Sequence, residues 1–131
     1  MAPIFRMVCT PAALAGAPPG WAAETLRDGD LALLIDDGGL EAINGAAHAL
    51  DLVTVAIVRQ EETAAEQAQT VIAFAESFPL VWVAEGLTDA ERTWARERRP
   101  MTLLLEMDGP LPDPERGRIE RFLALLARQT E

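Results

Sequence analysis

The chain has no lysine and no tyrosine, and it has one cysteine (Cys9), one histidine (His48) and one serine (Ser77). The missing lysine excludes the phosphate-loop, Schiff-base and receiver-domain chemistries that depend on a lysine. One cysteine and one histidine cannot form a structural zinc site or an iron–sulfur site. An intrachain disulfide is impossible. This cysteine usage fits a reducing compartment, and we expect the protein to be cytoplasmic.

The remaining nucleophiles and bases are poorly placed for hydrolysis. Ser77 lies at the end of a predicted helix beside Phe78 and Pro79, which is unlike the sharp strand-to-helix turn of a serine nucleophile. His48 lies late in a predicted helix among alanines, where a partner for the helix dipole is a better interpretation than a catalytic base. The sequence therefore disfavours a Ser/His/Asp triad.

Long apolar runs and positive charge are also lacking. No stretch of about 18 apolar residues occurs, so no membrane span is expected. Residues 11–17 are apolar, but glycine and proline interrupt this region, so a signal peptide is not expected. The formal net charge is −10, which repels nucleic-acid phosphates and anionic membrane surfaces. We expect neither nucleic acid nor membrane as a partner; the charge suits a basic partner or high solubility.

The 131 residues, half of them apolar, form one domain over residues 1–131 with its own core. Apolar runs typical of strands alternate with helical patterns. The predicted strands cover residues 4–9, 31–35, 52–58, 80–84 and 101–106. The predicted helices cover a short segment from residue 11 and then 21–27, 39–50, 64–78, 89–98 and the region from 113 onwards. A turn at residues 28–30 separates the second helix from the second strand.

Three threonines mark helix starts. Thr10 precedes a proline, and Thr63 and Thr88 each stand three residues before a glutamate, which is the capping-box spacing. The run 52–58 is apolar on both faces and rich in β-branched residues, as central parallel strands are. Alternating strands and helices imply crossover connections. The sequence thus predicts a three-layer, doubly wound, mostly parallel five-stranded sheet, flavodoxin-like or small Rossmann-like, with the strand order left open.

Ligands of open parallel sheets bind at the carboxyl ends of the strands. The first strand delivers Cys9 and Thr10 there, the third Arg59, Gln60 and Glu61, and the others mainly carboxylates. We predict a ligand-binding set at this rim: Asp36, Asp37, Gly38, Gly39, Arg59 and Glu85. The competing interpretation of the two glycines is a tight turn, and that of the acids is ordinary charge near helix starts.

Converging carboxylates could also hold Mg²⁺, which prefers oxygen ligands. The candidate ligands are Asp36, Asp37, Glu106 and Asp108. Magnesium would make a phosphate ester or anhydride the natural substrate, with Arg59 neutralising charge. We otherwise expect no cofactor.

Cys9 ends a strand just before a helix start, where a helix dipole can lower the pKa of a thiol. It is the one weak candidate for a catalytic residue. However, the following loop has no arginine, and Pro11 removes one N–H donor. A buried structural cysteine is the favoured interpretation.

Arg92, Arg96, Arg98 and Arg99 form a local basic patch around Trp94. We predict Trp94, Arg98 and Arg99 as a partner-binding surface. The alternative is that these arginines only complement the dipole of their helix.

The function that the sequence favours is a non-catalytic accessory, regulatory or interaction domain. It would bind a protein partner or a small ligand at the carboxyl ends of the strands, and it would associate as a homodimer. The alternatives are the Mg²⁺-dependent enzyme and, less favoured, thiol chemistry at Cys9.

Overall fold

The computed structural model describes residues 3–34, 39–49 and 56–129. The strands are β1 (Phe5–Cys9), β2 (Gly29–Leu34), β3 (Ala56–Val58), β4 (Leu80–Ala84) and β5 (Thr102–Glu106). The helices are α1 (Pro11–Leu14), α2 (Trp21–Thr25), α3 (Gly39–Ala49), α4 (Ala64–Ala75), α5 (Asp89–Glu97) and α6 (Asp113–Gln129). Helices and strands alternate along the chain as predicted.

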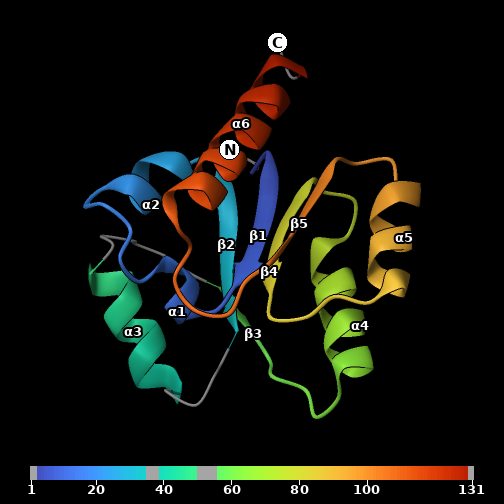
Figure 1. The fold of residues 1–131 in the computed structure, drawn as a ribbon, viewed down its shortest axis with the longest axis horizontal. Helices are drawn as coiled ribbons and strands as arrows, with labels where there is room; N and C mark the ends of the chain where they lie inside the picture. The colour runs from blue at the N-terminus through green and yellow to red at the C-terminus, as the bar shows by residue number, and fades with distance from the viewer. Residues whose placement is uncertain (1–2, 35–38, 50–55, 130–131) are drawn as a thin grey trace.

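The strands form a single parallel sheet in the order β3-β2-β1-β4-β5 (Figure 1). Val8 lies at its centre, paired with Ala32 on one side and Trp82 on the other. This order matches the first five strands of the doubly wound Rossmann arrangement. The predicted fold class is confirmed.

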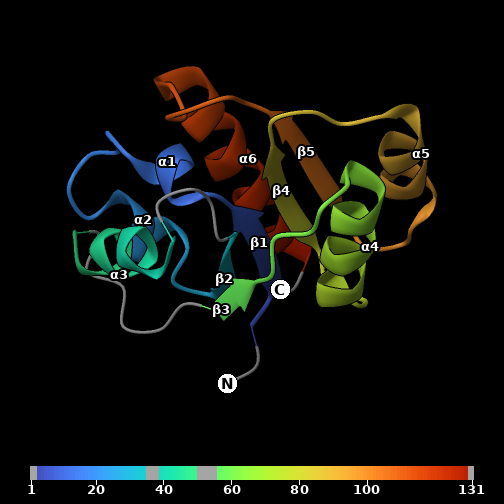
Figure 2. The same ribbon diagram turned by 90° about the horizontal axis from the view of Figure 1, so that it is seen from below.

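Side chains of β1, β2, β4 and β5 alternate between two cores, one on each face of the sheet. Met7 and Cys9 of β1 enter one core, which α1, α2, α3 and α6 supply and cover. Val8 enters the other, which α4 covers and against which Trp94 of α5 packs. Figure 2 shows these two layers of helices with the sheet between them. Both faces are apolar because a parallel sheet is buried on both sides.

Thr10 and Thr63 cap their helices as their spacing predicts, whereas the Thr88 hydroxyl accepts no hydrogen bond from the first turn of α5 and instead donates to Glu91. The Thr10 hydroxyl accepts a hydrogen bond from Ala13 N, with Pro11 at the first helical position. Thr63 accepts from Glu66 N at 3.1 Å and donates to the Glu66 carboxylate at 3.0 Å. These bonds satisfy N–H groups that a helix start leaves without partners.

The positions of three elements also differ from the prediction. The run 52–58 is not central: its described part, β3, is an edge strand, and Ile57 is 50% exposed. Residues 52–55 lie outside the described part. The apolar composition of this run predicted a central strand. Strand order is set by the crossover connections, however, and the composition of a single strand does not report them.

Gly29 begins β2 and is not part of a turn, because it pairs with Phe5 and lies under that ring. Helix α4 ends at Ala75, before the predicted residue 78, because Glu76 takes a positive φ of 48°. Among the described residues, no helix has the length and apolar character needed to cross a membrane.

Candidate functional site

The chain reverses its winding between β1 and β4. The helices after β1 cover one face of the sheet, whereas α5, which follows β4, lies on the other. The two connections therefore leave these adjacent strands in opposite directions and open a crevice at their carboxyl ends. Ligands of doubly wound sheets bind at such a switch point.

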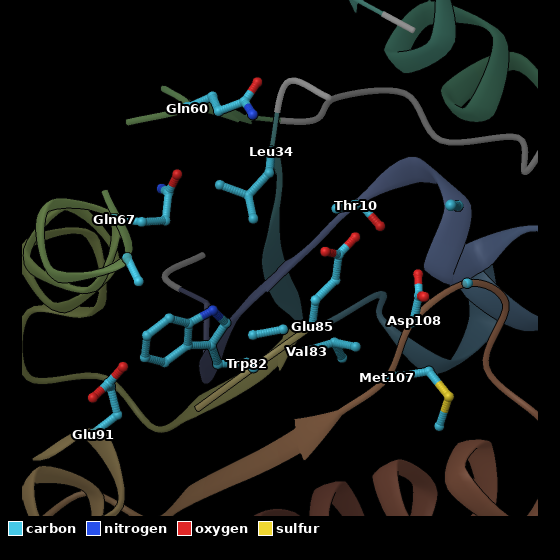
Figure 3. A pocket seen from close by; sticks show the side chains of 15 residues that line it. Thr10, Leu34, Gln60, Gln67, Trp82, Val83, Glu85, Glu91, Met107 and Asp108 are labelled. Carbon is cyan, nitrogen blue, oxygen red and sulfur yellow. The ribbon is translucent and has the colours of Figure 1, made fainter. Parts of the chain in front are cut away.

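A pocket of about 460 Å³ lies at this point. Its walls come from the carboxyl ends of β1, β2, β4 and β5 and from the start of α4, with Thr10, Leu34, Ala64, Trp82, Glu85 and Asp108 among the lining residues (Figure 3). Its volume is within the range of small-molecule sites. The strand ends supply the site because they share one edge of the sheet.

Trp82 forms part of the pocket wall. Its side chain is 3% exposed, and its indole Nε1 is buried without a hydrogen-bond partner among the described residues. In Figure 3 the nitrogen edge of the ring faces the interior of the pocket. A buried N–H without a partner is uncommon and costs about 1–3 kcal/mol.

Three carboxylates line the pocket, and two of them are exposed. Glu85 and Asp108 follow β4 and β5, and Figure 3 shows both carboxylates directed upwards from the wall. Glu91 is 7% exposed and accepts a hydrogen bond from the Thr88 hydroxyl. That bond holds the pKa of Glu91 below its ordinary value. Glu91 is therefore part of the helix cap, and the first two carboxylates set the charge of the pocket.

No basic side chain occurs among the described residues that line the pocket. The two nearest predicted arginines pair elsewhere. Arg59 Nε lies 2.9 Å from Glu61 Oε1, an interaction that lowers the pKa of Glu61. Arg92 forms an ion pair with Glu106. The pocket is therefore acidic, with one buried donor in its wall.

The start of α1 offers little to a phosphate. Thr10 occupies the N–H of Ala13, and Pro11 has no N–H. The helix is only four residues long. A dinucleotide-binding sheet has a glycine-rich loop at the equivalent place, and here a single residue joins β1 to α1.

The predicted ligand-binding residues separate into three groups. Glu85 lines the pocket, and its role in ligand binding stays a prediction. Arg59 and Gly39 are not among its lining residues; Gly39 has a φ of +65° at the start of α3, which fits the tight-turn interpretation. Asp36, Asp37 and Gly38 lie outside the described residues.

The predicted magnesium ligands can be located only in part. Asp108 lines the pocket, whereas Glu106 is paired with Arg92. Asp36 and Asp37 are in the undescribed segment. Within the described ranges, no group of three or more His, Cys, Asp or Glu side chains is placed to hold a metal ion. The four-carboxylate site stays a prediction.

Cys9 is fully buried in the core beneath α1. Burial raises the pKa of its thiol to about 12. The side chain is therefore protonated at neutral pH and closed to solvent, as a structural cysteine is. Ser77 and His48 are exposed and do not line the pocket.

The predicted partner-binding residues are adjacent, but two of them have internal roles. The Arg98 guanidinium stacks 4.7 Å from the Trp94 ring and donates to the carbonyl oxygens of Glu76 and Phe78 and to Thr102. Burial lowers the pKa of Arg98. Trp94 packs against the core under α4. Arg99 is exposed, and a partner at this surface stays a prediction.

Sequence reasoning placed Thr10, Gln60, Glu85 and Asp108 at the carboxyl rim, and all four line the pocket. It did not single out Trp82, which belongs both to the buried core and to the pocket wall. The available signal was its position, two residues before the end of a strand, which brings a large side chain near the rim. Its missing hydrogen bond could not be read from the sequence, because it depends on what the other strands place around it.

Comparison with protein-family models, curated proteins and solved structures finds no match to this chain. The candidate site therefore rests on its own geometry.

Proposed function

We propose that this protein is a non-catalytic domain that binds a small ligand in the pocket between the carboxyl ends of β1 and β4. The observation that carries the proposal is the coincidence of the pocket with the point where the sheet reverses its winding. A regulatory or accessory role follows from ligand binding without chemistry. The buried, single cysteine fits a reducing compartment, and we keep a cytoplasmic setting as part of the proposal.

The side chains around the pocket support binding more than catalysis. The Thr10 hydroxyl is used as a helix cap, and Glu91 is held by Thr88. Among groups able to act as a base, the described lining residues offer only carboxylates, and they include no histidine, cysteine or lysine. What is left is an apolar floor with a few polar groups, which is the usual composition of a recognition site.

A matched pair of substitutions on α4 tests the proposal. Ala64 lines the pocket and its neighbour Ala65 does not, although both are exposed at the start of the same helix. Ala64→Phe should fill the entrance and abolish the binding of fragments found by ligand-observed NMR, whereas Ala65→Phe should retain it. Both variants should unfold within about 1 kcal/mol of the wild type, because neither side chain enters the core.

Two results would contradict the proposal. One is a broad fragment library that yields no ligand for the wild type. The other is a set of ligands that bind Ala64→Phe as tightly as they bind Ala65→Phe, which would place them elsewhere on the protein.

The magnesium enzyme remains the alternative, and it makes a different prediction. Millimolar Mg²⁺ should raise the thermal midpoint of the wild type but not of the Asp36→Ala/Asp37→Ala variant, since a ligand of the native state stabilises it. We expect no rise in either, because Arg92 already neutralises Glu106.

A further inference from the structure

We infer that the ligand is a small organic cation that also carries a hydrogen-bond acceptor. The acceptor would meet Trp82 Nε1, the cationic group would lie at Glu85 and Asp108, and phosphorylated compounds would be rejected. This inference rests on the proposed function and names the chemical class of its ligand.

The acceptor follows from Trp82. Its Nε1 is buried without a partner in the described part of the chain, and the nitrogen edge of the ring faces into the pocket (Figure 3). Leaving such a donor unpaired is unfavourable, so buried indole nitrogens usually have a partner. An acceptor that enters the pocket and moves the surrounding side chains slightly apart would supply it. The carbonyl of an amide or a neutral ring nitrogen has this chemistry.

The positive charge of the ligand is inferred from the two exposed carboxylates in the pocket. Glu85 and Asp108 follow neighbouring strands of the sheet, and both line the pocket without an ion-pair partner among the described residues. Glu91, the third lining carboxylate, is 7% exposed and already accepts a hydrogen bond from Thr88, so the two exposed carboxylates are the ones that a cation can reach. An ammonium or guanidinium group can donate to both free carboxylates.

The exclusion of phosphates follows from the same charges and from two other features. No basic side chain is found among the described lining residues. The N–H groups at the start of α1 are reduced by Pro11 and by the Thr10 cap. A phosphate would therefore meet two carboxylates and find no compensating donors of the usual kind.

Three derivatives of one amino acid test the charge and the acceptor together. L-tyrosinamide is a cation with an amide carbonyl, N-acetyl-L-tyrosinamide is its neutral analogue, and O-phospho-L-tyrosine is anionic. Each is titrated into ¹⁵N-labelled protein while the indole N–H signals are followed. The chain has three tryptophans, so Trp82→Phe assigns the Trp82 signal by its loss.

L-tyrosinamide should shift the Trp82 indole signal and bind about three- to tenfold more tightly than the neutral analogue, the range expected for two exposed ion pairs. Phosphotyrosine should not bind. In Glu85→Gln/Asp108→Asn the advantage of the cation should disappear. The control Asp89→Asn/Glu97→Gln makes the same change in net charge at exposed residues of α5 outside the pocket, and it should keep the advantage.

Three outcomes would overturn the inference. Phosphotyrosine that binds as well as tyrosinamide would refute the charge preference. Ligands that shift other pocket signals without moving the Trp82 indole would refute the acceptor contact. Failure of all three compounds to bind would refute the ligand class. The proposed function is tested separately. It would be contradicted by a fragment library that yields no ligand, or by ligands that still bind the Ala64→Phe variant.

Discussion

The two ends of the sheet differ in how their polar groups are used. At the amino end, Arg6 and Arg98 hold the turn between α4 and β4. Arg6 donates to Phe74 O and to Glu76, and its guanidinium lies 4.3 Å from the Phe78 ring. Arg98 donates to Glu76 O and Phe78 O from the other side. At the carboxyl end, the indole Nε1 of Trp82 has no hydrogen-bond partner among the described residues, and Glu85 and Asp108 have no ion-pair partner among them.

This difference indicates that the polar groups at one end of the sheet stabilise the fold and that those at the other end are placed to contact a ligand. The arginine hydrogen bonds at the amino end stabilise the fold, although Arg6 Nε there is also buried without a hydrogen-bond partner among the described residues and lies 3.7 Å from Asp30 Oδ2. Polar groups that are incomplete in the isolated chain have capacity left for a ligand. The basic residues that the sequence assigned to a partner surface belong partly to the first kind. The candidate ligand contacts belong to the second.

The largest expected effect is at the amino end. Arg98→Ala removes three hydrogen bonds and the stacking on Trp94. We expect the free energy of unfolding in urea to fall by about 3 kcal/mol, because several charge-assisted hydrogen bonds and the packing on Trp94 are lost together. Binding in the pocket should not change in conditions where the variant is folded.

Arg99→Ala is the matched control, since Arg99 is the exposed neighbour of Arg98. It should change stability by less than about 0.5 kcal/mol. Equal effects of the two substitutions would show that Arg98 does not hold the turn as the hydrogen bonds indicate.

The second-largest effect on stability is expected at Gly29, the first residue of β2. A Cβ at Gly29 would lie 2.3 Å from the ring of Phe5, which is itself buried in the core. Gly29→Ala should therefore destabilise the protein by about 2 kcal/mol through overpacking. Gly45→Ala has open space in the middle of α3 and should stabilise by up to about 1 kcal/mol. Thermal unfolding checks the opposite signs, and a stable Gly29→Ala variant would contradict the close packing.

A smaller effect is expected at the carboxyl end. Trp82→Phe loses apolar volume, which destabilises a core, but it also removes the unpaired N–H, which stabilises it by about 1–3 kcal/mol. The net change in the free energy of unfolding should stay within about 1 kcal/mol. A loss as large as that of Arg98→Ala would indicate that the indole N–H has a partner in the free protein, and the contrast between the two ends would fail.

The smallest effect concerns Cys9, which lies at the carboxyl end but in the core. Burial raises the pKa of this thiol to about 12 in the folded state. The stability that the protonated thiol contributes is complete at pH values below the pKa of Cys9 in the unfolded chain. It is lost as the pH rises from there towards the pKa of Cys9 in the folded state. Between pH 7 and 9 the loss is about 0.4 kcal/mol.

Urea unfolding at several pH values measures this loss with little interference. The chain has no lysine or tyrosine that titrates in the same range. Cys9→Ala should remove the dependence. A slope that persists in Cys9→Ala would assign it to another group.

Much of the fold was readable from local patterns. The threonine caps at Thr10 and Thr63, the alternation of strands and helices, and the apolar runs predicted the fold class and most element positions. These features are local, because a cap or a periodic face acts within a few residues. The rim residues Glu85 and Asp108 were also predictable, since the carboxyl end of a strand is defined once the strand is.

The wrong predictions concern relations between distant segments. Strand 52–58 has a central composition, yet its described part is at the edge of the sheet. Helix α4 ends three residues early, where Arg6 and Arg98 bind the turn that follows it. Both facts depend on segments more than 20 residues away in the sequence, which no local pattern reports.

The sequence by itself determined the class of fold, the acidic character and the absence of lysine, tyrosine and disulfide chemistry, because these depend on composition and local periodicity. The tertiary structure alone decided the strand order, the switch point between β1 and β4, and the unpaired nitrogen of Trp82. Each of these depends on contacts among several strands. The free energy of those contacts comes from packing and hydrogen bonding across the whole sheet.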